Sequence, residues 1–205
     1  MTDPAVPIRT RRKRQARGEE RMREIVRAAA VVFAERGPEA ATTNAIAAEA
    51  GISPGSLYQF FSSKADIARA LSEHYAAELS GVRQTIMDVG QGTSIEASID
   101  AVVGPLVAFS LAHPGFKALF ARSDLPADMR DAVAPVQQAM HQTVATLIAR
   151  FMTERESADV DRIATVAIQI VRGMMPLITE APDPATRDAL TAELRTALAG
   201  YLTRA

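Results

Sequence analysis

The stretch from Thr42 to Lys64, TTNAIAAEAGISPGSLYQFFSSK, decides how this chain folds. Its first half carries small and apolar residues at helical spacing, so one stripe of a helix can be buried. Gly51 follows where that helix must stop, because glycine adopts the left-handed conformation at low cost. Ser53 can cap a second helix, and Pro54 suits its first turn. The pattern predicts two short helices joined by a tight turn, a helix-turn-helix; an ordinary helical hairpin is the alternative.

Helices are also predicted on both sides of this stretch. The first begins at Glu19, whose carboxylate suits the positive end of the helix dipole, and ends at Gly37-Pro38. The other follows Ser63, which forms a capping-box pattern with Asp66. A three-helix unit with its connector helix is therefore expected over residues 19–88, and a glycine-rich loop marks its end.

Positive charge is concentrated at the N-terminus. Residues 1–18 carry six Lys or Arg against one Asp, a net charge of +5 in a chain whose formal net charge is −1. The prolines and the few apolar residues of this segment predict a disordered basic arm. Such an arm can bind along DNA phosphates or in a minor groove. A merely solvated tail is an equal alternative.

The remaining residues, 89–205, show no strand signal, so the fold class is all-α. The helix expected over 160–178 is apolar or small on nearly every side, with Arg162, Gln169 and Arg172 as polar exceptions. A helix of this kind is buried on most sides, and a partner chain is expected to cover one of them. In the last helix, the stripe from Leu190 to Leu202 is expected at the same subunit interface.

Composition excludes several classes of function. The chain has no Cys, which excludes disulfides and thiolate chemistry. It shows no phosphate loop, GxSxG or HExxH motif, and His74, His113 and His141 have no metal-ligand spacing, so no enzyme, cofactor or metal site is expected. No run of eighteen apolar residues and no secretory signal are found, which favours a cytoplasmic protein without a membrane span.

A set of residues at fixed spacings resembles the tetracycline-repressor (TetR) family of bacterial transcription regulators. The resemblance covers roughly residues 20–80, whereas the C-terminal two-thirds is similar only in helix order and length. The matching positions are Gly37, Thr42-Thr43, Ile46-Ala47, Ala50-Gly51-Ile52-Ser53, Gly55, Leu57-Tyr58, Phe60 and Ser63-Lys64.

The resemblance implies a homodimer that binds a palindromic DNA operator, usually as a repressor. It also implies that the C-terminal domain binds a small-molecule effector and dimerises through its last two long helices. A ligand-independent or architectural DNA-binding dimer is the alternative.

The resemblance also assigns roles within the helix-turn-helix. Thr43, Tyr58 and Lys64 correspond to phosphate contacts, Asn44 to a base contact, and Pro54 to Gln59 to the exposed face of the recognition helix. Helix N-termini favour phosphate on physical grounds as well, and Gln can pair with adenine. Two departures are Ala41, where Thr is common, and Pro54, where Lys often stands. The DNA-binding candidates are Thr43, Asn44, Ser53, Pro54, Gly55, Ser56, Tyr58, Gln59 and Lys64.

Apolar residues of the C-terminal domain could line a cavity for a largely apolar effector, although each could equally belong to the core. The candidates are Phe109, Phe116, Phe120, Met140, Phe151, Met174 and Met175, with His113 and His141 as polar anchors. We expect bound effector to move the short helix around Phe116 and to tilt the connector helix. The tilt would change the separation of the two recognition helices.

Overall fold

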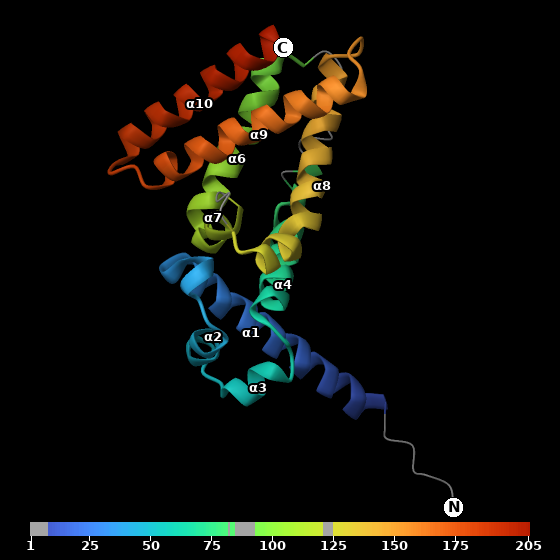
Figure 1. Cartoon of the computed structure of the whole chain (residues 1–205), viewed down its shortest axis with the longest axis vertical. Helices are drawn as coiled ribbons and strands as arrows, with labels where there is room; N and C mark the ends of the chain where they lie inside the picture. The colour runs from blue at the N-terminus through green and yellow to red at the C-terminus, as the bar shows by residue number, and fades with distance from the viewer. Residues whose placement is uncertain (1–7, 82, 85–92, 121–124) are drawn as a thin grey trace, which may run out of the picture.

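The structure is a computed structural model that describes residues 8–81, 83–84, 93–120 and 125–205. Every regular element within those ranges is an α-helix, so the predicted all-α fold is confirmed. Figure 1 labels the helices α1 (Ile8–Ala40), α2 (Thr43–Glu49), α3 (Pro54–Tyr58), α4 (Lys64–Glu78), α6 (Ile95–Ala112), α7 (Pro114–Phe120), α8 (Ala127–Phe151), α9 (Ser157–Thr179) and α10 (Pro184–Arg204).

The N-terminal helices form the predicted three-helix core. Figure 1 shows α2 and α3 on one side of α1, with α4 returning across it. Ile25 and Phe33 of α1, Ile46 of α2, Leu57 of α3 and Leu71 of α4 are all completely buried. These side chains supply the apolar faces that the sequence pattern predicts, and their burial fixes α3 relative to α1.

The prediction that residues 8–18 are disordered is wrong, because α1 begins at Ile8 rather than at Glu19. Arg, Lys, Gln and Ala dominate this segment, and all are good helix formers. A packed helix already follows, so each added turn needs no new nucleation. The Gln15 amide also donates a hydrogen bond to the Glu19 carboxylate at 3.2 Å. Residues 1–7 of the predicted arm lie outside the described residues.

A kink at Gly37 ends the straight part of α1. Its φ of 73° lies in the left-handed region, which glycine adopts without strain from a Cβ. Pro38 follows and cannot donate an amide hydrogen to continue the helix. The predicted end at Gly37-Pro38 is confirmed, with one further helical turn reaching Ala40.

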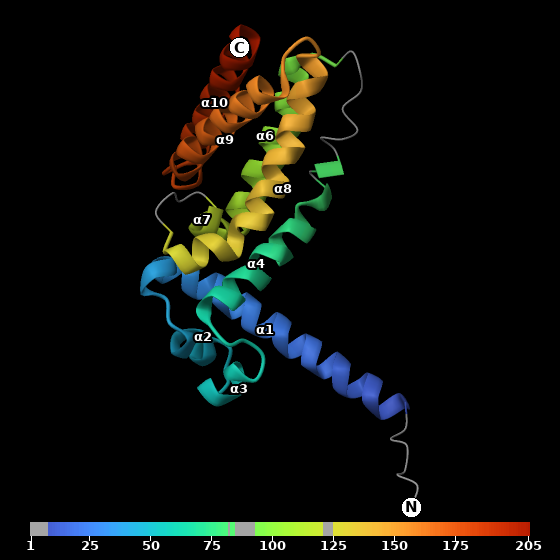
Figure 2. The same ribbon diagram turned by 45° about the vertical axis from the view of Figure 1, so that its right-hand side comes forward.

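Helix α7 lies between the two halves of the molecule. It packs more extensively against α1 than against any helix of the C-terminal half, and the two views of Figures 1 and 2 agree on this position. Phe116 and Leu119 of α7 share a hydrophobic core with α1 and α4. The C-terminal half has a second core, formed mainly by α6, α9 and α10. A shift of α7 would therefore directly alter its packing against α1.

Helices α9 and α10 form an antiparallel pair at the far end of the molecule (Figures 1 and 2). The leucine stripe of α10 does not face outward as predicted, because Leu194 and Leu198 are buried in the core of their own subunit. Helical periodicity identifies an apolar face but not which chain covers it. The exposed residues of α10 include the small or neutral Ala189, Ala192, Thr196 and Gly200, together with the charged Asp188 and Glu193.

By length and composition alone, α6 and α9 could cross a membrane, with mean hydropathies of 1.6 and 1.2. Both helices pack against α10 here, and their buried side chains form the second core. Core helices of helical domains commonly reach such values, so this is weak evidence against the prediction of no membrane span.

Candidate DNA-binding face and effector cavity

Local hydrogen bonds fix the turn between α2 and α3. The Thr42 hydroxyl accepts from the Ala45 amide and the Ser53 hydroxyl accepts from the Ser56 amide, each at 3.1 Å. Gly51 has a φ of 64°, as its predicted role in the turn requires. The helix-turn-helix is therefore confirmed, and both short helices begin at capped positions.

The predicted reading residues lie together on the surface around α3. Asn44, Pro54, Gly55 and Gln59 are exposed, and Ser56 is half-buried. The Ser56 hydroxyl is hydrogen-bonded to the capping Ser53 hydroxyl at 2.9 Å. This face carries no charged side chain, so it offers shape and hydrogen-bonding groups but little electrostatic attraction to DNA.

Two predicted phosphate contacts are joined to each other. The Thr43 hydroxyl oxygen lies 2.9 Å from the Tyr58 hydroxyl oxygen, and Tyr58 is 53% exposed. Thr43 starts α2 and Tyr58 ends α3, so this bond links the outer ends of the helix-turn-helix.

Lys64 has a structural role that the sequence did not indicate. Its ammonium donates to three carbonyl oxygens, those of Pro38 at 2.7 Å, Ala41 at 2.9 Å and Glu39 at 3.2 Å. An ammonium has three donors, and all three are directed at the turn that follows the α1 kink. Lys64 thus ties the start of α4 to the end of α1, while its phosphate contact stays a prediction.

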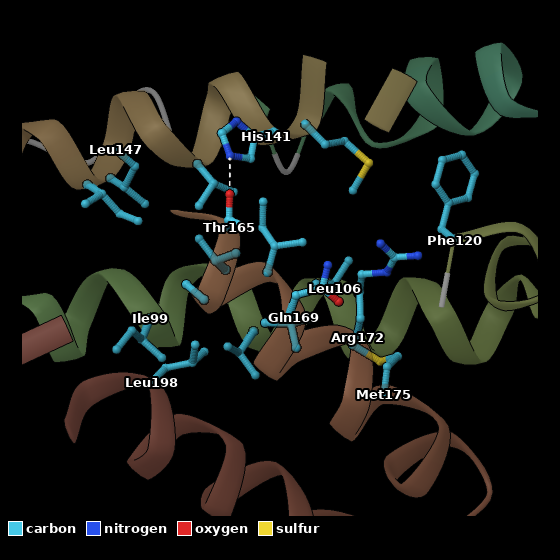
Figure 3. A pocket seen from close by; sticks show the side chains of 18 of the residues that line it. Ile99, Leu106, Phe120, His141, Leu147, Thr165, Gln169, Arg172, Met175 and Leu198 are labelled. Atoms are coloured by element: carbon cyan, nitrogen blue, oxygen red, sulfur yellow. Dashed lines mark hydrogen bonds between the residues drawn. The ribbon is translucent and has the colours of Figure 1, made fainter. Parts of the chain in front are cut away.

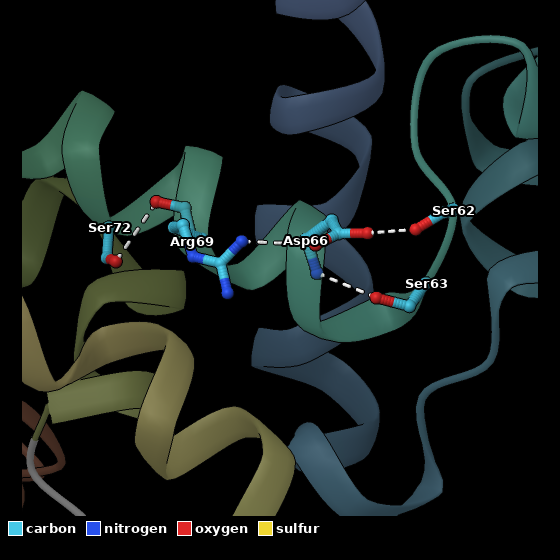
Figure 4. Close-up of polar contacts among 5 residues, drawn as sticks. All are labelled: Ser62, Ser63, Asp66, Arg69 and Ser72. Carbon is cyan, nitrogen blue, oxygen red and sulfur yellow. Dashed lines mark hydrogen bonds and ion pairs between the residues drawn. The ribbon is translucent and has the colours of Figure 1, made fainter.

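The cap of α4 is a small polar network around Asp66 (Figure 4). The Ser63 hydroxyl accepts from the Asp66 amide at 3.1 Å, which confirms the predicted cap. The Ser62 hydroxyl donates to the Asp66 carboxylate, and the Arg69 guanidinium donates to it at 3.1 Å. The hydrogen bond from Ser62, followed by that of Ser63, lowers the pKa of Asp66 below its ordinary value.

Gly115 lies at a close approach between the two halves. A Cβ placed on it would lie 2.6 Å from the Tyr75 hydroxyl and 2.7 Å from the Ala30 carbonyl oxygen. Tyr75 of α4 is 2% exposed, and its burial raises the pKa of its hydroxyl. Only a residue without a side chain allows α7 to seat this closely on α1 and α4.

Two predicted effector contacts belong to this junction instead. Phe109 and His113 pack against the Tyr75 ring, with centroid distances of 6.0 and 5.7 Å, and neither lines the large cavity. Phe109 of α6 and His113, the residue after α6, lie against α4, a tertiary relationship that residue type alone does not give. His113 and His74 also lie near the Glu78 carboxylate, at 3.6 and 3.4 Å.

A cavity of about 510 Å³ lies between α6, α8 and α9, with α7 at one end (Figure 3). Of the predicted effector residues, Phe116, Phe120, Met140 and His141 line it, as do Phe151 and Met175. Met174 does not line it and is partly buried against the second core. Most of the remaining wall is aliphatic.

Polar side chains in the cavity were missed by the sequence interpretation. They are Ser98, Ser110, Lys117, Gln137, Gln138, Thr165, Gln169 and Arg172, in addition to His141. His141 Nε2 lies 3.1 Å from the Thr165 hydroxyl, the pair joined by the dashed line in Figure 3. The sequence feature that could have indicated a polar part of the cavity is the presence of Gln169 and Arg172 in an otherwise apolar helix.

The fold and these two sites define a helix-turn-helix protein whose second helical domain contains a ligand-sized cavity. Residues 25–71 match the family model "Bacterial regulatory proteins, tetR family", and residues 94–202 match "Tetracyclin repressor-like, C-terminal domain". The chain belongs to the TetR family, whose members are DNA-binding transcription regulators and not enzymes.

Solved structures share this fold. A TetR-family transcriptional regulator from Streptomyces coelicolor is 24% identical, with a TM-score of 0.64 over 90% of this chain and 98% of that one. The MbdR regulator from Azoarcus sp. CIB is 22% identical, with a TM-score of 0.67 over 87% and 96%. A TetR-family regulator from Agrobacterium tumefaciens is 18% identical, with a TM-score of 0.65 over 88% and 98%. At these identities the similarity extends to the fold alone.

Among the described residues, no group of three His, Asp or Glu side chains is arranged to hold a metal ion.

Proposed function

We propose that this protein is a cytoplasmic homodimeric repressor that binds a palindromic DNA operator and is released from it by a small, largely apolar effector. The position of Phe116 is the main observation in support of this proposal. This side chain lines the large cavity and also packs edge-on against Tyr75 of α4, with ring centroids 5.6 Å apart. One residue therefore contacts both the effector space and the connector helix.

On the DNA side, α3 would enter the major groove with Pro54 to Gln59 facing the bases. The Gln59 amide suits adenine, and the Pro54 ring or Ser56 suits a thymine methyl. Because this face is uncharged, phosphate contacts from Thr43, Tyr58 and the basic start of α1 would supply most of the affinity. Residues 9–17 carry six Lys or Arg, and the helical form of this segment extends away from α3 (Figure 2).

The dimer would form through the outer faces of α9 and α10. Val166 and Leu177 of α9 are 37% and 56% exposed in the single chain, an apolar surface that a second copy would cover. A Cβ on Gly173 or Gly200 would meet nothing within 4 Å, so these positions leave room for close approach of another helix. A two-fold dimer would place its two recognition helices about 34 Å apart, one turn of DNA.

Effector binding would act through α7 and α4. A smaller cavity of about 130 Å³ lies beside Ala76 and Leu79 near the end of α4 and shares Leu106 and Met140 with the large one. A ligand that displaces Phe116 or Met140 would shift α7 on α1 and tilt α4. A difference of ~3 kcal/mol in ligand affinity between the two arrangements would weaken DNA binding about 100-fold.

The experiment that tests this function is selection of bound DNA from a random pool at a stated salt concentration. A palindromic consensus supports the proposal, whereas recovery of unrelated sequences contradicts it. A thermal-shift survey with small apolar compounds then separates the effector-controlled repressor from the ligand-independent dimer. Stabilisation by none of them would favour the ligand-independent dimer.

A further inference from the structure

The lining of the large cavity extends along the helices. Ile95 and Ser110 of α6 both line it, and their positions are roughly 22 Å apart at the usual rise of an α-helix. Gln137 and Phe151 of α8 line it over a similar length. A sphere with the same volume of about 510 Å³ would be only about 10 Å across. The cavity is therefore elongated, and Figure 3 shows α6 and α8 running along its two sides.

One end of this cavity is apolar. Figure 3 places Leu147 of α8, Ile99 of α6 and Leu198 of α10 together at that end. Ser98 lies beside Ile99 in the lining, but its hydroxyl donates to the Ser94 carbonyl oxygen at 2.8 Å and is satisfied within α6. The neighbouring lining side chains are hydrocarbon, namely Ile95, Val144, Ile148, Phe151 and Leu202. This end therefore suits a hydrocarbon part of a ligand.

Polar side chains lie at the mouth of the cavity, which is formed by Gln138 of α8 and by Thr165 and Gln169 of α9. All three line the cavity and are exposed in the single chain. Their side chains are neutral donors and acceptors of hydrogen bonds. Lys117 and Arg172 also line the cavity, but both already interact within the protein, so neither requires a charged ligand. A neutral polar mouth and a hydrocarbon interior together fit an amphipathic ligand.

We propose that the effector is a linear amphiphile with one unbranched hydrocarbon chain. Its polar head lies at the mouth beside Gln138 and Gln169, and its tail extends along α6 toward Leu147 and Leu198. This rests on the proposed effector role of the cavity and names the chemical class that it recognises. Each methylene of such a chain leaves water for an aliphatic wall. A compact ligand of the same volume would leave the apolar end without contacts.

Three straight-chain alcohols test the proposal: 1-hexanol, 1-octanol and 1-decanol. Titration calorimetry measures their binding to the full-length protein without DNA. We expect the affinity to rise about fourfold for each added methylene, because each one is removed from water. The hydroxyl is the same in all three probes, so the differences between them report on the tail alone.

The variants Leu147→Trp and Leu111→Trp separate the length of the cavity from the general effect of a bulky side chain. Leu147 lies at the apolar end, whereas Leu111 of α6 is 38% exposed and lines neither the large nor the small cavity. Leu147→Trp should shorten the cavity, so that 1-hexanol binds as in wild type while 1-decanol binds no more tightly than 1-hexanol. Leu111→Trp should keep the wild-type rise. Leu202→Trp, at the apolar end on α10, should repeat the result of Leu147→Trp, and melting temperatures show whether each variant is folded.

An affinity that does not rise from 1-hexanol to 1-decanol in the wild type would overturn the proposal, as would binding of none of the alcohols. In a folded Leu147→Trp or Leu202→Trp variant, a retained rise would overturn it as well. An equal loss of affinity for all three alcohols would do the same, because it would indicate a compact site. These outcomes are distinct from failure of the proposed function, because DNA selection on the same preparation does not depend on them.

Discussion

The Thr43 and Tyr58 hydroxyl oxygens lie 2.9 Å apart at the surface, joining the first residue of α2 to the last residue of α3. One hydroxyl must donate to the other, which leaves one hydroxyl hydrogen free to point outward. A single DNA phosphate could accept that hydrogen, so the two residues are expected to act as one contact.

Tyr58→Phe should weaken binding to every DNA sequence roughly 10- to 30-fold, at ~1 kcal/mol for each of the two copies in a dimer. The slope of affinity against salt concentration should not change, because no charge is removed. Fluorescence anisotropy over several salt concentrations measures both. Tyr201→Phe, on α10, is the matched control. A loss limited to one base pair of the operator would contradict a phosphate contact.

Lys64→Met should lower the stability of the protein. The three carbonyl oxygens of Pro38, Glu39 and Ala41 would lose a charged donor, at a cost of about 1–3 kcal/mol. Thermal unfolding measures this effect. Arg36→Met removes the same charge from a nearby exposed position and should unfold at nearly the wild-type temperature.

The salt dependence of DNA binding gives separate information on Lys64. A decrease of ~1 in the salt slope of Lys64→Met would mean that the ammonium also contacts phosphate, as the sequence predicts. An unchanged melting temperature would contradict the structural role.

Local signals in the sequence were sufficient for the helix-turn-helix. Gly51, Ser53 and Ser63 act through their own backbone conformation or a hydrogen bond three residues away, so their roles can be predicted without the fold. The helical start of α1 was missed because the prolines and the few apolar residues of the segment were interpreted as disorder. Strong helix formers attached to a packed helix outweigh that signal.

Tertiary relationships could not be predicted in the same way. Phe109 and Phe116 are both aromatic and close in sequence, yet only Phe116 reaches the cavity. Leu194 has the periodicity of an interface residue but is buried against its own subunit. The local sequence does not show that glycine is required at Gly115. That requirement arises from close contacts with Ala30 and Tyr75, which are distant in sequence.

Gly115→Ala should disturb the junction between the two halves. Its Cβ would overlap the backbone of Ala30, so α7 must move away from α1, at about 1–3 kcal/mol of stability. DNA affinity should change without any substitution in the DNA-binding unit. Unfolding and DNA titration together measure these effects.

Gly104→Ala is the control for that substitution. A Cβ at Gly104 would meet only the Arg195 guanidinium, at an ordinary 3.7 Å, and alanine favours a helix over glycine. This variant should be as stable as wild type or slightly more so. Wild-type stability and DNA affinity in Gly115→Ala would show that the contact does not couple the two halves.

Acid should weaken the cap of α4. The folded-state pKa of Asp66 is lowered from 3.8, first by the Ser62 hydroxyl and then by Ser63. Its stabilisation is therefore complete above the unfolded pKa and is lost as the pH falls through the lower, folded value. Asp66→Asn should be less stable than wild type at pH 6, and this difference should shrink below pH 4.

Melting temperatures between pH 2 and pH 7 measure the contribution of Asp66. Asp131→Asn, at an exposed position of α8, is the control and should follow the wild-type curve. A difference between wild type and Asp66→Asn that stays constant over this range would contradict the assigned network.

Two helix-turn-helix units in one dimer are expected to bind one operator, since a single uncharged reading face should bind poorly. The most direct measurement compares the selected palindrome with the same duplex carrying one scrambled half-site, at one stated salt concentration. We expect two protomers on the intact duplex and an affinity loss of about 100-fold or more on the scrambled one. Equal affinity for both duplexes, with one protomer bound to each, would contradict this expectation.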